Sequence, residues 1–208
     1  MTLDLKKAIF IILSFSLIII SCRHRINWNY LSQEDMENLR KEFNLPKEKT
    51  FRLDTNYIRY LFSFDTTKYT VEIHNHYQPL QATYYDNSGR LISFHINCYA
   101  SAAIPGDSDF NWNQQNAFAS FVPRTVVPVD SILPLNKHLS FIKNFDYKSI
   151  DTTGFAAFDY TVIVYWSKHY FGTKNTKNLI KIVSDNAALA SNKKVNVIYV
   201  NSENILYY

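Results

Sequence analysis

Near the C-terminus the chain reads Thr161-Val162-Ile163-Val164-Tyr165-Trp166, an unbroken apolar run. Because both faces of such a run are apolar, it predicts a strand that other elements cover on both sides. Residues 176–192 then place apolar side chains along one helical stripe, and Val195–Val200 form a second apolar run. Strand, helix and strand at this spacing predict a βαβ unit over residues 160–202, with parallel strands and a right-handed crossover.

A second pattern, earlier in the chain, predicts a β-hairpin. β-branched and aromatic residues at 82–85 and 90–99 flank the turn cluster Asp86-Asn87-Ser88-Gly89. In the second run apolar and polar residues alternate as far as Cys98, so we expect its thiol on the buried face rather than as a reactive group. The two patterns together predict an α+β or α/β fold with a mixed sheet.

The C-terminal unit resembles the thioredoxin family. Residues 165–174 begin with Tyr165 and Trp166 at the end of a strand and finish with Lys174 at the start of a helix. In thioredoxins this region carries the C-x-x-C motif. Residues 197–201 resemble the family's next strand. Tyr170 and Thr173 replace both cysteines, and without a thiolate at a helix N-terminus we expect no disulfide exchange there. The resemblance implies a thioredoxin-like sheet, and the alternative is an unrelated α+β protein that contains a βαβ unit.

The same segment is the candidate site for a ligand or a partner protein. Backbone N–H groups at the start of a helix lack helical partners and favour anions. No spacing of histidines and carboxylates forms a catalytic set, so no catalytic residue is predicted. The candidate binding residues are Trp166, His169, Tyr170, Thr173 and Lys174.

The N-terminus has the layout of a secretory signal. Lys6 and Lys7 precede a thirteen-residue apolar run, Ala8–Ile20, and Ser21 stands before Cys22. A cysteine directly after a small residue resembles the lipobox of bacterial lipoproteins, in which a diacylglyceryl group is attached to the cysteine. Cleavage before the cysteine and acylation of the new N-terminus, commonly with palmitate, then follow. An uncleaved membrane span would need about 20 apolar residues.

This resemblance divides the chain and implies its location. Residues 1–21 would be the signal peptide, 22–30 a tether and 31–208 a single α/β globular domain. The protein would lie in the envelope of a Gram-negative bacterium. Lipid on Cys22 would hold it to the inner or outer membrane, with the domain in the periplasm.

Composition narrows the classes of function. Four glycines in 208 residues provide no Gly-rich phosphate loop, and no cofactor is predicted. The net charge of +4 is spread over dispersed basic residues, which does not favour nucleic acid as a partner. With 16% aromatic residues and the family thiols replaced, we expect a non-catalytic binding module with an envelope protein as partner. The alternatives are an enzyme of undetermined class and a thiol-dependent protein that acts through Cys98.

Three further segments complete the expectations. Ser32 and Asp35 form a capping box that starts a helix, which Pro46 ends. Residues 135–145 predict a short helix. If residues 71–77 form a strand, His74 and His76 share one face, an arrangement that metals use. No third ligand lies nearby, so no metal site is predicted.

The loop-rich residues 100–134 carry aromatic side chains that could bind a partner but that we expect to cover the sheet: Phe110, Trp112, Phe118 and Phe121.

Overall fold

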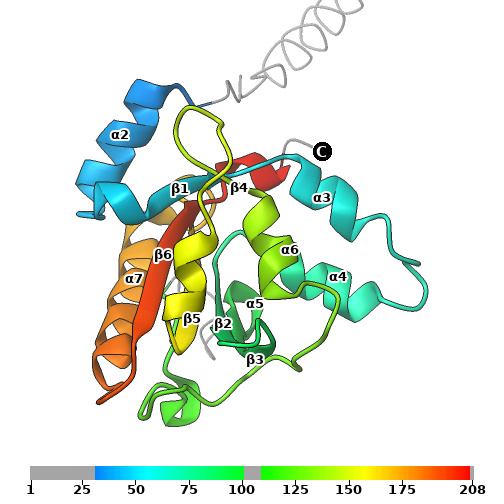
Figure 1. Cartoon of the computed structure of the whole chain (residues 1–208), viewed down its shortest axis with the longest axis vertical. Coiled ribbons are helices and arrows are strands. Elements are labelled where there is room, and N and C mark those ends of the chain that lie inside the picture. Colours follow the sequence, from blue (N-terminus) through cyan, green and yellow to red (C-terminus); the bar gives the residue numbers. More distant parts are fainter. Residues whose placement is uncertain (1–30, 101–108, 207–208) are drawn as a thin grey trace, which may run out of the picture. The chain divides into compact units, whose positions relative to one another are not determined.

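A six-stranded mixed sheet forms the centre of the fold in a computed structural model that describes residues 31–100 and 109–206 (Figure 1). The strand order is β3-β2-β5-β6-β1-β4. β5 lies inside the sheet, with β6 parallel on one side and β2 antiparallel on the other. The strands are β1 (Thr50–Leu53), β2 (Gln81–Asp86), β3 (Leu91–Ile96), β4 (Ile142–Lys143), β5 (Tyr160–Trp166) and β6 (Val195–Asn201).

Helices cover both faces of this sheet (Figure 1). α2 (Gln33–Glu42) and the long α7 (Gly172–Ala188) pack on one face, and α3 (Asn56–Leu61), α4 (Thr70–His76) and α6 (Leu135–Ser140) pack on the other. The short α5 (Asn97–Ala100) follows β3. Four single-turn 3-10 helices complete the described elements: η1 (Lys47–Lys49), η2 (Gln114–Asn116), η3 (Thr153–Ala157) and η4 (Glu203–Leu206). The mixed α+β fold, the hairpin β2–β3 and the parallel unit β5–α7–β6 are thereby confirmed.

β5 is apolar throughout because its side chains enter two separate cores. Ile163 and Tyr165 pack with α3 and α6, while Val162, Val164 and Trp166 pack with α2 and α7. All five side chains are fully buried. Since burying one large apolar side chain stabilises a fold by about 1.5–3 kcal/mol, this strand contributes to both layers at once.

Two local expectations are confirmed at the level of side chains. Ser32 Oγ accepts a hydrogen bond from the Asp35 N–H at 3.0 Å, and Asp35 Oδ2 accepts one from the Ser32 N–H at 3.1 Å, which forms the expected capping box of α2. Trp112 and Phe118 are buried in the core beneath α2 and α7. The aromatic residues of this loop therefore cover the sheet.

The segment with His74 and His76 is a helix, so the strand considered for residues 71–77 is wrong. Tyr69 and Ile73 lie four residues apart and both pack against the core, which is a helical spacing. In α4 the two histidines point apart. His76 is buried and its Nε2 lies 3.0 Å from Asp130 Oδ2, whereas His74 is exposed.

Cys98 does not lie on the buried face of the hairpin, and that expectation is also wrong. The Asn97 N–H donates to the Leu80 carbonyl at 3.0 Å, and β3 ends at Ile96. Cys98 then stands in α5 with an exposed side chain. The polar Asn97 breaks the strand one residue before the alternation reaches the thiol.

In the described part of the chain, no helix combines the length and the apolar character that crossing a bilayer requires. Residues 1–30, which hold the expected signal peptide, the tether and Cys22, lie outside the described residues.

A buried histidine links α6 to the sheet. His138 Nδ1 lies 2.8 Å from the Tyr85 hydroxyl, and His138 Nε2 lies 2.6 Å from the Tyr165 hydroxyl. Because the Tyr85 hydroxyl donates to the Leu133 carbonyl at 3.1 Å, its oxygen accepts a hydrogen bond from Nδ1–H, and the Tyr165 hydroxyl donates to Nε2. A neutral imidazole satisfies this arrangement. Burial, and then the nearby His76, hold the pKa of His138 well below its ordinary value.

Acid is therefore expected to destabilise the fold. Burial also lowers the pKa of His95 to about 3, so His95 and His138 stay neutral in the folded chain. The unfolded chain binds protons at both residues below about pH 6.5. The two histidines therefore cost the folded chain nothing above this pH. Below it, the free energy of unfolding decreases by up to about 1.4 kcal/mol per histidine per pH unit.

Urea unfolding should accordingly show a free energy of unfolding about 2 kcal/mol lower at pH 5 than at pH 6. His138→Leu should remove about half of this slope, and substitution of the exposed His74 by Asn should leave it unchanged. A free energy of unfolding that is the same at both pH values would contradict the assignment of neutral buried histidines.

Candidate functional site

The segment between β5 and α7 brings only part of the expected binding residues to the surface. Trp166 is fully buried, and its ring centroid lies 5.2 Å from that of Phe43, so it faces the core. His169 is 47% exposed, and its Nδ1 lies 3.2 Å from Glu203 Oε1. The Tyr170 hydroxyl donates to the Glu203 carbonyl oxygen at 3.2 Å. Both surface residues therefore contact Glu203.

Glu203 is an internal carboxylate beside the expected anion site, because it binds N–H groups of the loop that precedes α7. Its side chain is 2% exposed, and Oε1 accepts hydrogen bonds from the N–H groups of Lys168 at 2.7 Å and His169 at 3.3 Å. Parallel pairing of β5 and β6 places the ends of the two strands together, and η4 follows β6 directly. Glu203 is not among the residues predicted from the sequence. Its position just after the second strand of the βαβ unit is the signal that could have identified it.

The remaining candidates, Thr173 and Lys174, contact charged partners within the chain, and so does the neighbouring Lys168. Lys168 Nζ lies 2.8 Å from Glu42 Oε2, and this bond lowers the pKa of the Glu42 carboxyl, with a smaller contribution from Thr173. Lys174 forms an ion pair with Asp109. The polar groups at the start of α7 thus contact α2 and the loop before η2.

Replacing Glu203 tests whether it is an internal anion. Glu203→Ala should lower the free energy of unfolding by about 2–3 kcal/mol, because the N–H groups of Lys168 and His169 lose a charged acceptor. Chemical denaturation at pH 7 measures this change, and adding sulfate should recover part of the loss. Glu48→Ala, at an exposed carboxylate, is the matched control. Equal stability of the wild-type and Glu203→Ala chains would contradict this role.

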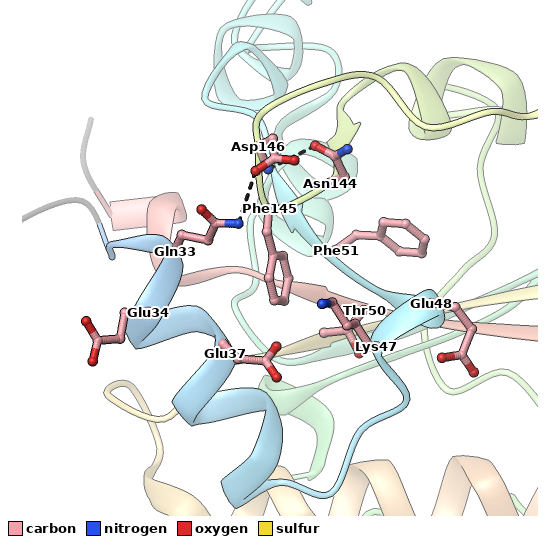
Figure 2. Close-up of a pocket in the computed structure, with 10 residues that line it drawn as sticks. All are labelled: Gln33, Glu34, Glu37, Lys47, Glu48, Thr50, Phe51, Asn144, Phe145 and Asp146. Carbon is pink, nitrogen blue, oxygen red and sulfur yellow. Dashed lines mark hydrogen bonds between the residues drawn. The ribbon is translucent and has the colours of Figure 1, made fainter.

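A groove of about 850 Å³ lies between α2, β1 and the turn that follows β4. β4 pairs with β1 only opposite Arg52 and Leu53, so the chain leaves the sheet after Lys143 and the groove opens at that point. Figure 2 shows the Phe145 ring projecting between α2 and β1. The groove is lined by Gln33, Glu34, Glu37, Lys47, Glu48, Thr50, Phe51, Asn144, Phe145 and Asp146.

Hydrogen bonds hold the two walls of the groove in place. Gln33 Nε2 on α2 donates to Asp146 Oδ1 at 3.1 Å, and the Asp146 N–H donates to Asn144 Oδ1 at 3.0 Å (Figure 2). Glu37 Oε1 lies 2.7 Å from the Arg40 guanidinium, whose hydrogen bond lowers the pKa of the Glu37 carboxyl. Four of the polar wall groups therefore already have partners within the chain.

The chemistry of the groove is that of a binding site. Phe145 is half-buried and offers apolar ring surface, while carboxylates and amides line the groove around it. Ligand sites commonly combine apolar surface with a few oriented polar groups, in cavities of roughly 300–1,000 Å³. The sequence analysis did not identify this groove.

The thiol and the histidines do not form a metal centre. Cys98 Sγ donates to Gln78 Oε1 at 3.1 Å, and Gln78 Nε2 lies 3.3 Å from His74 Nε2, so the glutamine bridges the two residues. Burial raises the pKa of the Cys98 thiol, which reduces the reactive thiolate fraction. Within residues 31–100 and 109–206 no three His, Cys, Asp or Glu side chains are grouped so that they could hold a metal ion.

In comparisons with known proteins, the chain matches no family model, no curated protein and no solved structure.

Proposed function

We propose that the protein is a lipid-anchored binding module of the bacterial cell envelope, and that its binding site is the groove between α2 and β1. The groove carries this proposal because it combines the half-buried Phe145 ring with polar side chains on two walls in about 850 Å³. Membrane attachment through Cys22 is supported by the lipobox-like layout of the N-terminus. An envelope protein is the proposed partner.

The arrangement of groups in the groove supports binding rather than catalysis. Glu37 is paired with Arg40, and Asp146 accepts a hydrogen bond from Gln33, so two of the four carboxylates that line the groove already have partners. Fixed acceptors of this kind orient a ligand and lose little entropy when it binds.

We further propose that the sheet is a rearranged thioredoxin-like unit without thiol chemistry. The hairpin β2–β3 adds antiparallel strands beside β5, although in the chain it precedes the unit β5–α7–β6. Tyr170 and Thr173 stand in place of the motif cysteines, and Glu203 binds the N–H groups before α7. On this proposal the original site is closed, and binding has moved to the groove between α2 and β1.

Site-specific cross-linking in cells tests the groove as a binding site. Photo-reactive benzoylphenylalanine at Glu48, an exposed residue of the groove, should capture a specific adduct that mass spectrometry identifies. Phe145→Ala should reduce the yield about tenfold, the equivalent of about 1.4 kcal/mol, because the ligand loses a phenyl contact.

The control places the same probe at Leu189, an exposed apolar residue just after α7. Leu189 should not give this adduct. An identical adduct at Leu189, or a yield that Phe145→Ala does not change, would remove the groove as the binding site.

A further inference from the structure

A second pocket, of about 550 Å³, lies where the hairpin turn meets the start of α6 and η3. Its polar side chains are mostly neutral amides and hydroxyls, among them Asn87, Asn136 and Thr152. Phe155 and Phe158 supply two half-buried phenyl rings. The pocket therefore differs from the groove, whose polar residues are mainly charged.

The one charged residue that lines this pocket has its partners within the turn. Asp86 Oδ1 accepts hydrogen bonds from the N–H groups of Ser88 and Arg90, both at 3.0 Å. Asp86 Oδ2 accepts a hydrogen bond from Arg90 Nε at 3.1 Å. With this charge paired, the pocket provides no net attraction for an ionic ligand.

The turn is fixed against α6 before any ligand binds. The Leu135 N–H donates to the Gly89 carbonyl at 2.9 Å. Gly89 has a φ of +80°, and a Cβ atom at this position would lie 3.3 Å from Leu135 Cβ. This close approach requires glycine and sets the position of Asn87 relative to Asn136.

We infer that this pocket binds a neutral saccharide. Amide side chains and hydroxyls each donate and accept hydrogen bonds, as sugar hydroxyls do, so the two sets can pair without charge. The negative face of a phenyl ring attracts the C–H groups of a sugar ring, and Phe155 and Phe158 offer such faces. The inference rests on this pocket alone and does not depend on the proposed groove.

Titration of the full-length protein with cellotriose, maltotriose and N,N′-diacetylchitobiose, followed by isothermal calorimetry and NMR, tests the inference. At least one of these sugars should bind with a Kd below about 10 mM, which corresponds to about −2.7 kcal/mol. Phe155→Ala and Asn136→Ala should each weaken this binding about tenfold. Phe145→Ala, in the groove, should leave the Kd unchanged.

Two results would overturn the inference. One is the absence of binding by all three sugars at 20 mM, with NMR spectra that show the chain folded. The other is sugar binding that Phe155→Ala and Asn136→Ala leave unaltered, or that Phe145→Ala weakens, since the sugar would then bind elsewhere. Failure of the sugar titration leaves the cross-linking result at Glu48 unaffected, so the two proposals are tested separately.

Discussion

β5 must be covered on both faces, and the arrangement of the other elements follows from this constraint. Its side chains alternate between the core beneath α2 and α7 and the core beneath α3 and α6. β2 and β6 take up its two edges, so its backbone polar groups pair inside the sheet. The short strands β1 and β4 then extend the sheet away from its centre, and the groove opens where they part.

The strongly patterned elements could be predicted from the sequence. The continuous apolar run of β5 and the largely apolar run of β6 indicate buried strands, the helical period of α7 indicates a helix, and a cluster of turn residues marks the hairpin. β4 has two residues and carries no period of its own. α4 was misread because the seven residues Thr70–His76 contain both histidines and few apolar positions, and its packing partners lie elsewhere in the chain. The sequence does not mark the turn from β3 into α5 at Asn97, because the alternation of apolar and polar residues continues to Cys98.

The sites were less predictable because they join distant parts of the chain. Gln33 and Asp146, which brace the groove, are 113 residues apart, and Glu203 reaches Lys168 across 35 residues. The sequence predicts unpaired N–H groups at the start of α7, whereas the carboxylate of Glu203 binds N–H groups of Lys168 and His169 in the loop before that helix. A pattern of residue types shows which groups need partners, and only the three-dimensional arrangement shows which partners they have.

Attachment through Cys22 is the central part of the proposed function, because it would restrict the groove to partners present in the cell envelope. The most direct measurement is intact mass spectrometry of the protein extracted from the membranes of a Gram-negative host. We predict a mature chain that begins at Cys22 and carries acyl groups on its thiol and its N-terminus, and we predict that Cys22→Ser abolishes the modification. A chain that keeps residues 1–21 and has an unmodified Cys22 would contradict the account.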